Sequence, residues 1–96
     1  DYTAEDFVAV AREAGGADVI LDIVGGDNVA RNIKAAAPNG VIVQLAFARG
    51  SRLEIDLMPV MLKRLTYTGS TLRSRPAGDK ARIAGELSSL VWPLFA

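Results

Sequence analysis

Two stretches of the chain, residues 18–24 and 41–46, are apolar at nearly every position. The first of them ends in the pair Gly25-Gly26. Strands that are apolar on both faces are typical of parallel sheets that helices cover on each side. The two stretches therefore predict buried strands. The stretch Thr66–Leu72, rich in β-branched and aromatic residues, predicts a third strand.

The segments between these stretches have apolar residues at helical spacing. Thr3, with Asp6 three residues later, resembles a capping box and predicts a first helix that ends at Gly15-Gly16. Further helices are expected at 29–37, from Pro59 to about residue 64, and after Pro76, with a bend or an end near Trp92 because of Pro93. The alternation at 53–57 is compatible with a short strand or an extended piece.

The expected order is helix, strand, helix, strand, helical connection, strand, helix. Alternation of this kind favours right-handed βαβ units on a parallel sheet. The fold class predicted is therefore α/β, a partial Rossmann arrangement with three main parallel strands flanked by helices.

Composition narrows the possible chemistry. The 96 residues carry eleven basic and eleven acidic side chains, and no basic stripe points to a nucleic-acid partner. Cysteine and histidine are absent, which excludes disulfides, the usual zinc ligand sets and histidine acid–base catalysis for this chain. No apolar stretch has the length of a membrane span and no signal peptide opens the chain, so a cytoplasmic protein is expected. An opening Asp1 and a final apolar helical pattern indicate a piece of a longer protein.

The carboxyl ends of the expected strands are the candidate site, because ligands of doubly wound sheets bind there. These ends are Val24-Gly25-Gly26, Ala46-Phe47-Ala48 and Gly69-Ser70-Thr71. Phe47 could pack against a ring, and the two hydroxyls could form hydrogen bonds. Glycines at strand ends also make tight turns without any ligand, and local sequence leaves both interpretations open.

Five charged positions have mainly structural interpretations. Asp22 lies in an apolar strand and is expected to accept hydrogen bonds from backbone amides near the glycine pair, because a buried carboxylate without partners is costly. Lys63 and Arg64 are expected on an exposed helix face, with their stems against apolar neighbours. Arg73 and Arg75 are expected to form a solvated rim. No Gly-x-Gly-x-x-Gly motif, phosphate loop or nucleophile elbow is present.

Several motifs resemble one family. They are residues 16–26, the segments 32–37 and 40–43, the stretch 56–65 with 68–73, and Val91-Trp92-Pro93-Leu94. Together they are similar, in order and across the whole chain, to the zinc-free, zeta-crystallin-like NADPH:quinone oxidoreductases of the medium-chain dehydrogenase/reductase superfamily. The resemblance implies the second half of a Rossmann domain, with the glycine fingerprint and the residue that selects NAD or NADP upstream.

The resemblance also implies cofactor contacts. Val24 and Gly25 match a contact beside the adenosine and ribose of NADPH. The loop over the nicotinamide half corresponds to Ala46, Phe47 and Arg49, and the strand end near the ring corresponds to Gly69, Ser70 and Thr71. No residue of this chain is expected to be catalytic, since the cofactor carries the hydride.

The resemblance further implies a quinone or another conjugated carbonyl as substrate, and a homodimer joined along Thr66–Leu72. An exposed edge rich in strand-forming residues is a pairing surface. Two alternatives stay open: a related enone or enoyl reductase, and a non-enzymatic α/β binding or dimerisation module, because a fold does not determine a function.

Overall fold

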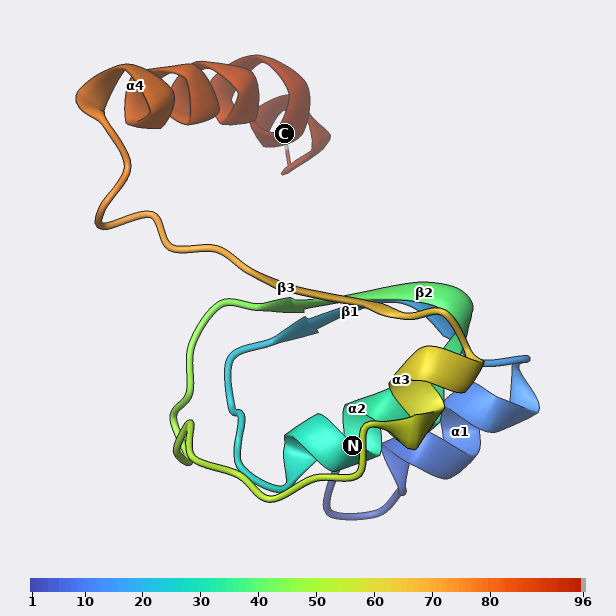
Figure 1. Cartoon of the computed structure of the whole chain (residues 1–96). Helices are drawn as coiled ribbons and strands as arrows, with labels where there is room; N and C mark the ends of the chain where they lie inside the picture. The colour runs from blue at the N-terminus through green and yellow to red at the C-terminus, as the bar shows by residue number, and fades with distance from the viewer. Residues whose placement is uncertain (96) are drawn as a thin grey trace.

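A three-stranded parallel sheet forms the centre of the molecule (Figure 1). The computed structural model describes residues 1–95. The strands β1 (Ala17–Asp22), β2 (Ala36–Gln44) and β3 (Thr66–Gly69) lie side by side in chain order. Three parallel strands flanked by helices confirm the α/β, Rossmann-type prediction.

Three helices cover one face of this sheet. They are α1 (Phe7–Glu13), α2 (Asn28–Ala35) and α3 (Met58–Leu62), and Figure 1 shows them on the same side. The core between them is small and contains Val29, Ile33, Ala36 and Ile42. Ile42 is completely buried at the centre of β2.

The opposite face of the sheet is open. Successive side chains of a strand point to opposite faces, and Val19 and Leu21 of β1, with Ile23 directly after the strand, are 61 to 66% exposed. Val19 pairs with Val41, and Leu21 pairs with Val43, so the open face is apolar across two strands.

The C-terminal helical segment stands apart from the sheet (Figure 1). It consists of α4 (Ala77–Glu86), a π-helical turn η1 (Leu87–Val91) and a 3-10 turn η2 (Trp92–Phe95), and none of these elements contains a buried residue. The helical geometry changes from π to 3-10 at Trp92, next to Pro93, where a bend or an end was expected. The radius of gyration, 15.7 Å, exceeds the value of about 12.5 Å that a compact chain of this length would have.

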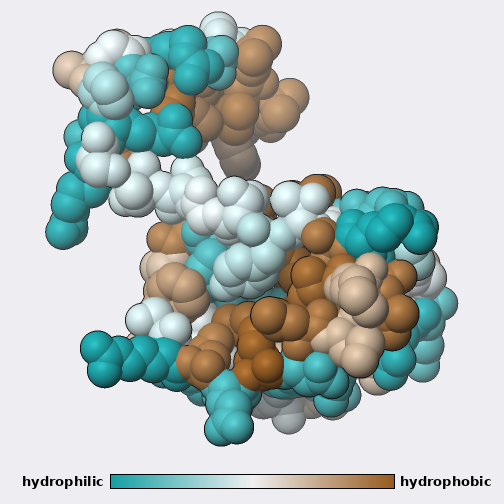
Figure 2. Space-filling model, viewed as in Figure 1, coloured by the Kyte–Doolittle hydropathy of each residue, from teal (hydrophilic) through white to brown (hydrophobic). Residues whose placement is uncertain are grey.

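Apolar side chains gather in two places on the surface that Figure 2 shows, over the helical side of the sheet and at the end of the C-terminal segment. The residues concerned include Met61 and Leu62 of α3 and Leu94 of η2, all largely exposed. Isolated surface residues of this kind are common, but contiguous apolar patches mark contacts with other surfaces.

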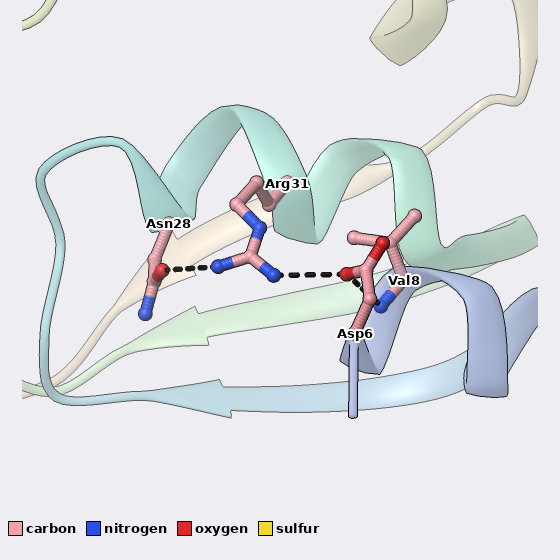
Figure 3. A network of polar contacts seen from close by, with 4 residues as sticks. All are labelled: Asp6, Val8, Asn28 and Arg31. Carbon is pink, nitrogen blue, oxygen red and sulfur yellow. Dashed lines mark hydrogen bonds and ion pairs between the residues drawn. The ribbon is translucent and has the colours of Figure 1, made fainter. Parts of the chain in front are cut away.

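The first helix begins at a different residue from the one predicted. Asp6, not Thr3, is its N-cap, and its carboxylate accepts a hydrogen bond from the backbone N–H of Val8. Figure 3 shows Arg31 of α2 reaching the same carboxylate at 2.9 Å and, on its other side, Asn28 at 3.5 Å. Hydrogen bonding to Arg31 lowers the pKa of Asp6, and the contact joins α1 to α2.

Three strand boundaries also differ from prediction. β1 ends at Asp22, two residues early, because the Asp22 side chain captures the amides that follow. β2 begins at Ala36, so the last residues of the expected helix 29–37 belong to the strand, and Asn39 adopts a φ of 64° inside it. β3 ends at Gly69, not Leu72. Among the residues described, the segment 53–57 forms no strand.

Candidate functional site

The turn after β1 and the loop after β2 are joined to each other at the carboxyl edge of the sheet. The backbone amide of Arg49 donates to the Val24 carbonyl at 2.7 Å, and that of Gly26 donates to the Gly50 carbonyl at 3.0 Å. A third bond runs from the Ala48 amide to the Ile23 carbonyl at 3.2 Å. The loop is therefore held against the first strand end by its own backbone.

Gly25 is needed because this loop comes so close. Its φ is +66°, which side chains other than glycine rarely adopt, and a Cβ there would lie 2.5 Å from Cδ1 of Phe47. The Gly50 carbonyl oxygen would be at 2.8 Å. The turn-making interpretation is therefore supported at Gly25, because the chain itself fills the space on the side where a Cβ would point.

Asp22 organises the same turn from below. Its carboxylate accepts hydrogen bonds from the amide of Val24 at 2.7 Å, from the amide of Gly25 at 3.2 Å and from the Asn32 side chain at 3.0 Å. The side chain is buried, and each of its oxygens has partners. The expected structural role is confirmed, and the additional bond to α2 explains how the carboxylate tolerates burial.

Gln44 ties the three strands together beneath the site. Its amide nitrogen donates to the Ala46 carbonyl at 2.6 Å and to the Asp22 carbonyl at 3.2 Å. Its amide oxygen accepts from the Tyr67 hydroxyl of β3 at 2.6 Å. Burial raises the pKa of Tyr67, and the charge of Asp22 adds to the rise. The network holds the ends of β2 and β3 in fixed relative positions.

An open depression of about 560 Å³ lies between the ends of β2 and β3. Its lining comes from both strand ends and from the turn that follows β3: Gln44, Leu45, Ala46, Phe47, Gly69, Ser70, Thr71 and Arg75. Small-molecule sites commonly have volumes of about 300–1,000 Å³ and combine apolar walls with few polar groups. The depression has both properties.

The structure brings together most of the candidate residues from the sequence. The five that line the depression are Ala46, Phe47, Gly69, Ser70 and Thr71. The other three are outside this lining: Val24 is half-buried, Gly25 is buried beneath the loop, and the exposed Arg49 packs its Cβ near Gly26. Sequence reasoning missed Gln44, although a polar residue near the end of an apolar strand is a detectable signal.

Arg75 is the second residue that was missed. A Leu72–Arg75 turn, closed by a hydrogen bond of 3.1 Å from the Arg75 amide to the Leu72 carbonyl, follows β3. The guanidinium then donates to the Ser70 hydroxyl at 3.0 Å. The solvated-rim interpretation is therefore wrong for Arg75, whereas Arg73 is exposed.

The exposed-face interpretation is also wrong for Lys63, which is half-buried, whereas Arg64 is exposed as expected. The Lys63 ammonium donates to the carbonyls of Ile33 at 2.6 Å and Ala36 at 2.8 Å, where α2 ends. Burial and, to a lesser extent, the charge of Arg12 lower the pKa of Lys63. The Arg64 guanidinium donates to the Asn39 side chain at 3.0 Å. Both residues fasten α3 to the opposite end of the sheet.

Two other features are absent from residues 1–95. No group of three or more potential metal-ligating side chains comes together in this part of the chain. None of its helices is both long and apolar enough to cross a membrane.

Similarity to known proteins agrees with this geometry. Residues 1–89 match the family described as zinc-binding dehydrogenase. The chain is 35% identical over 72 residues to the quinone oxidoreductase-like protein 2 homolog of Nematostella vectensis, and this match covers 72% of the chain but 20% of that protein.

Solved structures share the arrangement of strands and helices. An NAD-dependent alcohol dehydrogenase superposes with a TM-score of 0.70 at 28% identity, covering 91% of this chain and 25% of that one. Escherichia coli quinone oxidoreductase complexed with NADPH superposes with a TM-score of 0.75 at 24% identity, covering 95% and 30%. The chain thus spans less than a third of each of these proteins. It belongs to the zinc-binding dehydrogenase family, and its sheet is a Rossmann-type segment of the medium-chain dehydrogenase/reductase superfamily.

Proposed function

We propose that residues 1–96 form the second half of a dinucleotide-binding domain in an NADPH-dependent, quinone reductase-like oxidoreductase. The observation that carries the proposal is the depression at the carboxyl ends of β2 and β3. Ligands of doubly wound sheets bind at this edge. The family match supports a dehydrogenase, and the Nematostella vectensis relative supports the quinone reductase branch.

The lining of the depression fits the nicotinamide half of such a cofactor. Leu45 and Phe47 offer apolar surface to a planar ring, and Gly69 leaves room for close approach. Ser70 and Thr71 add hydroxyls for a carboxamide. When bound, the cofactor would supply a hydride, while these residues orient the ring and exclude water from one side of it.

The remaining assignments follow the resemblance. Val24 and Gly25 would lie beside the adenosine and ribose, and Arg49 would belong to the covering loop. We propose that the complete protein is zinc-free and cytoplasmic, and both assignments come from the resemblance of the motifs. Metal analysis of the complete protein would test the first, with bound zinc at one equivalent as the contrary result.

The edge of β3 supports a proposed homodimer. All four residues of β3 are exposed, and its outer edge has no partner strand among the residues that the structure describes. Continuing the sheet into a second copy would satisfy these backbone groups. Sedimentation of the complete protein should give a dimer, and lysine substitution of Thr68 should weaken it, whereas a monomer at high concentration would contradict the proposal.

Binding calorimetry tests the cofactor assignment. The complete protein should bind NADPH, and the 96-residue chain should not bind it with submicromolar affinity, because the pyrophosphate cradle lies upstream in this proposal. Mixing the complete protein with NADPH and a quinone should oxidise the cofactor, as followed by nicotinamide absorbance. Absence of nicotinamide binding in the complete protein would contradict the whole proposal.

A related enone or enoyl reductase is the alternative that this assay separates. Such an enzyme would bind the same cofactor but oxidise it with an unsaturated carbonyl compound and not with a quinone. A non-enzymatic α/β module would neither bind nor oxidise NADPH. Comparing NADPH with NADH in the same assay would establish the cofactor preference.

A further inference from the structure

Arg75 has a role at the depression that its position in the sequence did not reveal. Its Nη2 atom donates to Oγ of Ser70 at 3.0 Å, and both side chains belong to the lining. The three ion pairs among the described residues join Asp1 to Glu5, Arg31 to Asp6 and Arg82 to Glu86, so Arg75 takes no part in them. Among the described residues, the hydrogen bond to Ser70 is therefore the polar contact of the Arg75 side chain.

This bond decides what the serine can do. A guanidinium only donates, so the serine oxygen must act as the acceptor in the contact. The serine proton then has to point elsewhere, and in the described part of the chain the Ser70 hydroxyl donates to no other group. The backbone amide of Ser70 donates to the Gln44 carbonyl at 3.1 Å, which fixes the backbone of this residue at the end of β3.

A positive charge on the acceptor side also strengthens the serine as a donor. Hydrogen bonds in series polarise one another, and the effect is larger where one partner is charged. Ser70 therefore presents a directed, strengthened O–H to whatever lies in the depression. The matching ligand group is a hydrogen-bond acceptor such as an amide carbonyl oxygen.

We infer that Arg75 is a positioning residue that orients the Ser70 hydroxyl toward a ligand carbonyl, and, building on the proposed function, that this carbonyl is the nicotinamide carboxamide oxygen. Arg75 acts through Ser70 in this arrangement and does not itself contact the cofactor. Two other roles of Arg75 predict different results: a purely structural role, and direct binding of a phosphate by its guanidinium.

A double-mutant cycle in the complete protein separates these arrangements. Ser70→Ala should weaken NADPH binding about 3- to 10-fold, the usual worth of one hydrogen bond. Arg75→Met should weaken it by a similar or smaller factor, and the double variant should be no weaker than Ser70→Ala alone, because the two changes remove the same interaction. Arg73→Met removes a neighbouring exposed charge on the same turn and should leave affinity within about 2-fold, as is typical of surface substitutions.

The second readout is the discrimination between NADPH and its thionicotinamide analogue, whose sulfur is a weaker acceptor than the carboxamide oxygen. The wild-type protein should prefer NADPH, and both Ser70→Ala and Arg75→Met should reduce this preference. Arg75→Lys should restore part of it, since an ammonium can also donate to the serine. Thermal unfolding of each variant would show whether the fold is retained.

Several results would overturn the inference. Additive effects of the two substitutions, with unchanged discrimination, would mean that Arg75 works independently of Ser70. Equal loss for both cofactors with a weaker salt dependence of binding in Arg75→Met would indicate direct phosphate contact. If the wild-type protein binds NADPH but Ser70→Ala binds equally well, this inference fails while the proposed function stands; if the wild type binds no nicotinamide cofactor, both fail.

Discussion

The two faces of the sheet have similar apolar sequences but opposite environments. On the helical face, Ile42 is completely buried, and Ile20 packs against the same core. On the other face, Val19 and Leu21 of the same strand β1, and Ile23 directly after it, are largely exposed. Adjacent residues of one strand thus differ in burial because α1, α2 and α3 all lie on one side.

The strands lack the alternation of apolar and polar residues that is typical of a sheet with one solvent-exposed face. A sheet with one solvated face would carry polar residues on that face, whereas β1 presents the apolar Val19 and Leu21 there. An uncovered apolar face of this kind marks a surface that another layer is expected to cover. The exposed C-terminal segment, whose apolar side chains also lack a partner surface in the described region, fits the same interpretation.

Substitution of one residue from each face gives the largest expected contrast. Ile42→Ala should lower the free energy of unfolding of the 96-residue chain by about 2–5 kcal/mol, because it leaves a cavity in the core. Leu21→Ala should change it by no more than about 0.5 kcal/mol, since that side chain is already exposed. Denaturant titration of the two variants measures both values.

The same pair can reveal a second layer. If Leu21→Ala costs clearly more in the complete protein than in the 96-residue chain, another part of that protein covers this face. Equal and small costs in both would show that the face stays open, and would contradict the expectation of a second layer.

Sequence patterns predicted the order of elements but not their ends. The runs at 18–24 and 41–46 located β1 and β2 because apolar burial dominates in a parallel sheet. The early end of β1 depends on the Asp22 side chain binding two amides. The sequence predicted these bonds but not that they would end the strand. Likewise, Arg75 reaches Ser70 only through the geometry of a turn, so composition alone classed it with the exposed Arg73.

A smaller effect concerns the polar end of the helical face. Asp22→Asn should lower the free energy of unfolding by about 2 kcal/mol, because the new amide places donors against the amides of Val24 and Gly25. Asp18→Asn, at the exposed start of the same strand, should have little effect. Equal costs for the two variants would mean that the buried carboxylate contributes no specific stabilisation.

The smallest effect is one of pH and separates a partly buried hydrogen bond, that of Tyr67, from an almost fully exposed side chain. In the folded state the pKa of Tyr67 is raised by burial and by Asp22, whereas in the unfolded chain it is about 10. Below pH 10 both states are protonated and the stabilisation is complete. As the pH rises beyond about 10, the unfolded chain loses its proton first, so the folded state binds more protons and stability falls.

Replacing Tyr67 by Phe should remove this alkaline component and cost about 0.5–1 kcal/mol at neutral pH through loss of the hydrogen bond to Gln44. Tyr2→Phe is the matched control, because Tyr2 is almost fully exposed and has no comparable contact in the described structure. Unfolding titrations at several alkaline pH values, with tyrosinate absorbance to follow ionisation, make the comparison. If the free energy of unfolding depends on pH in the same way in the wild type and in Tyr67→Phe, the Tyr67 hydroxyl does not contribute the alkaline component. The two faces of the sheet would then differ in apolar burial alone.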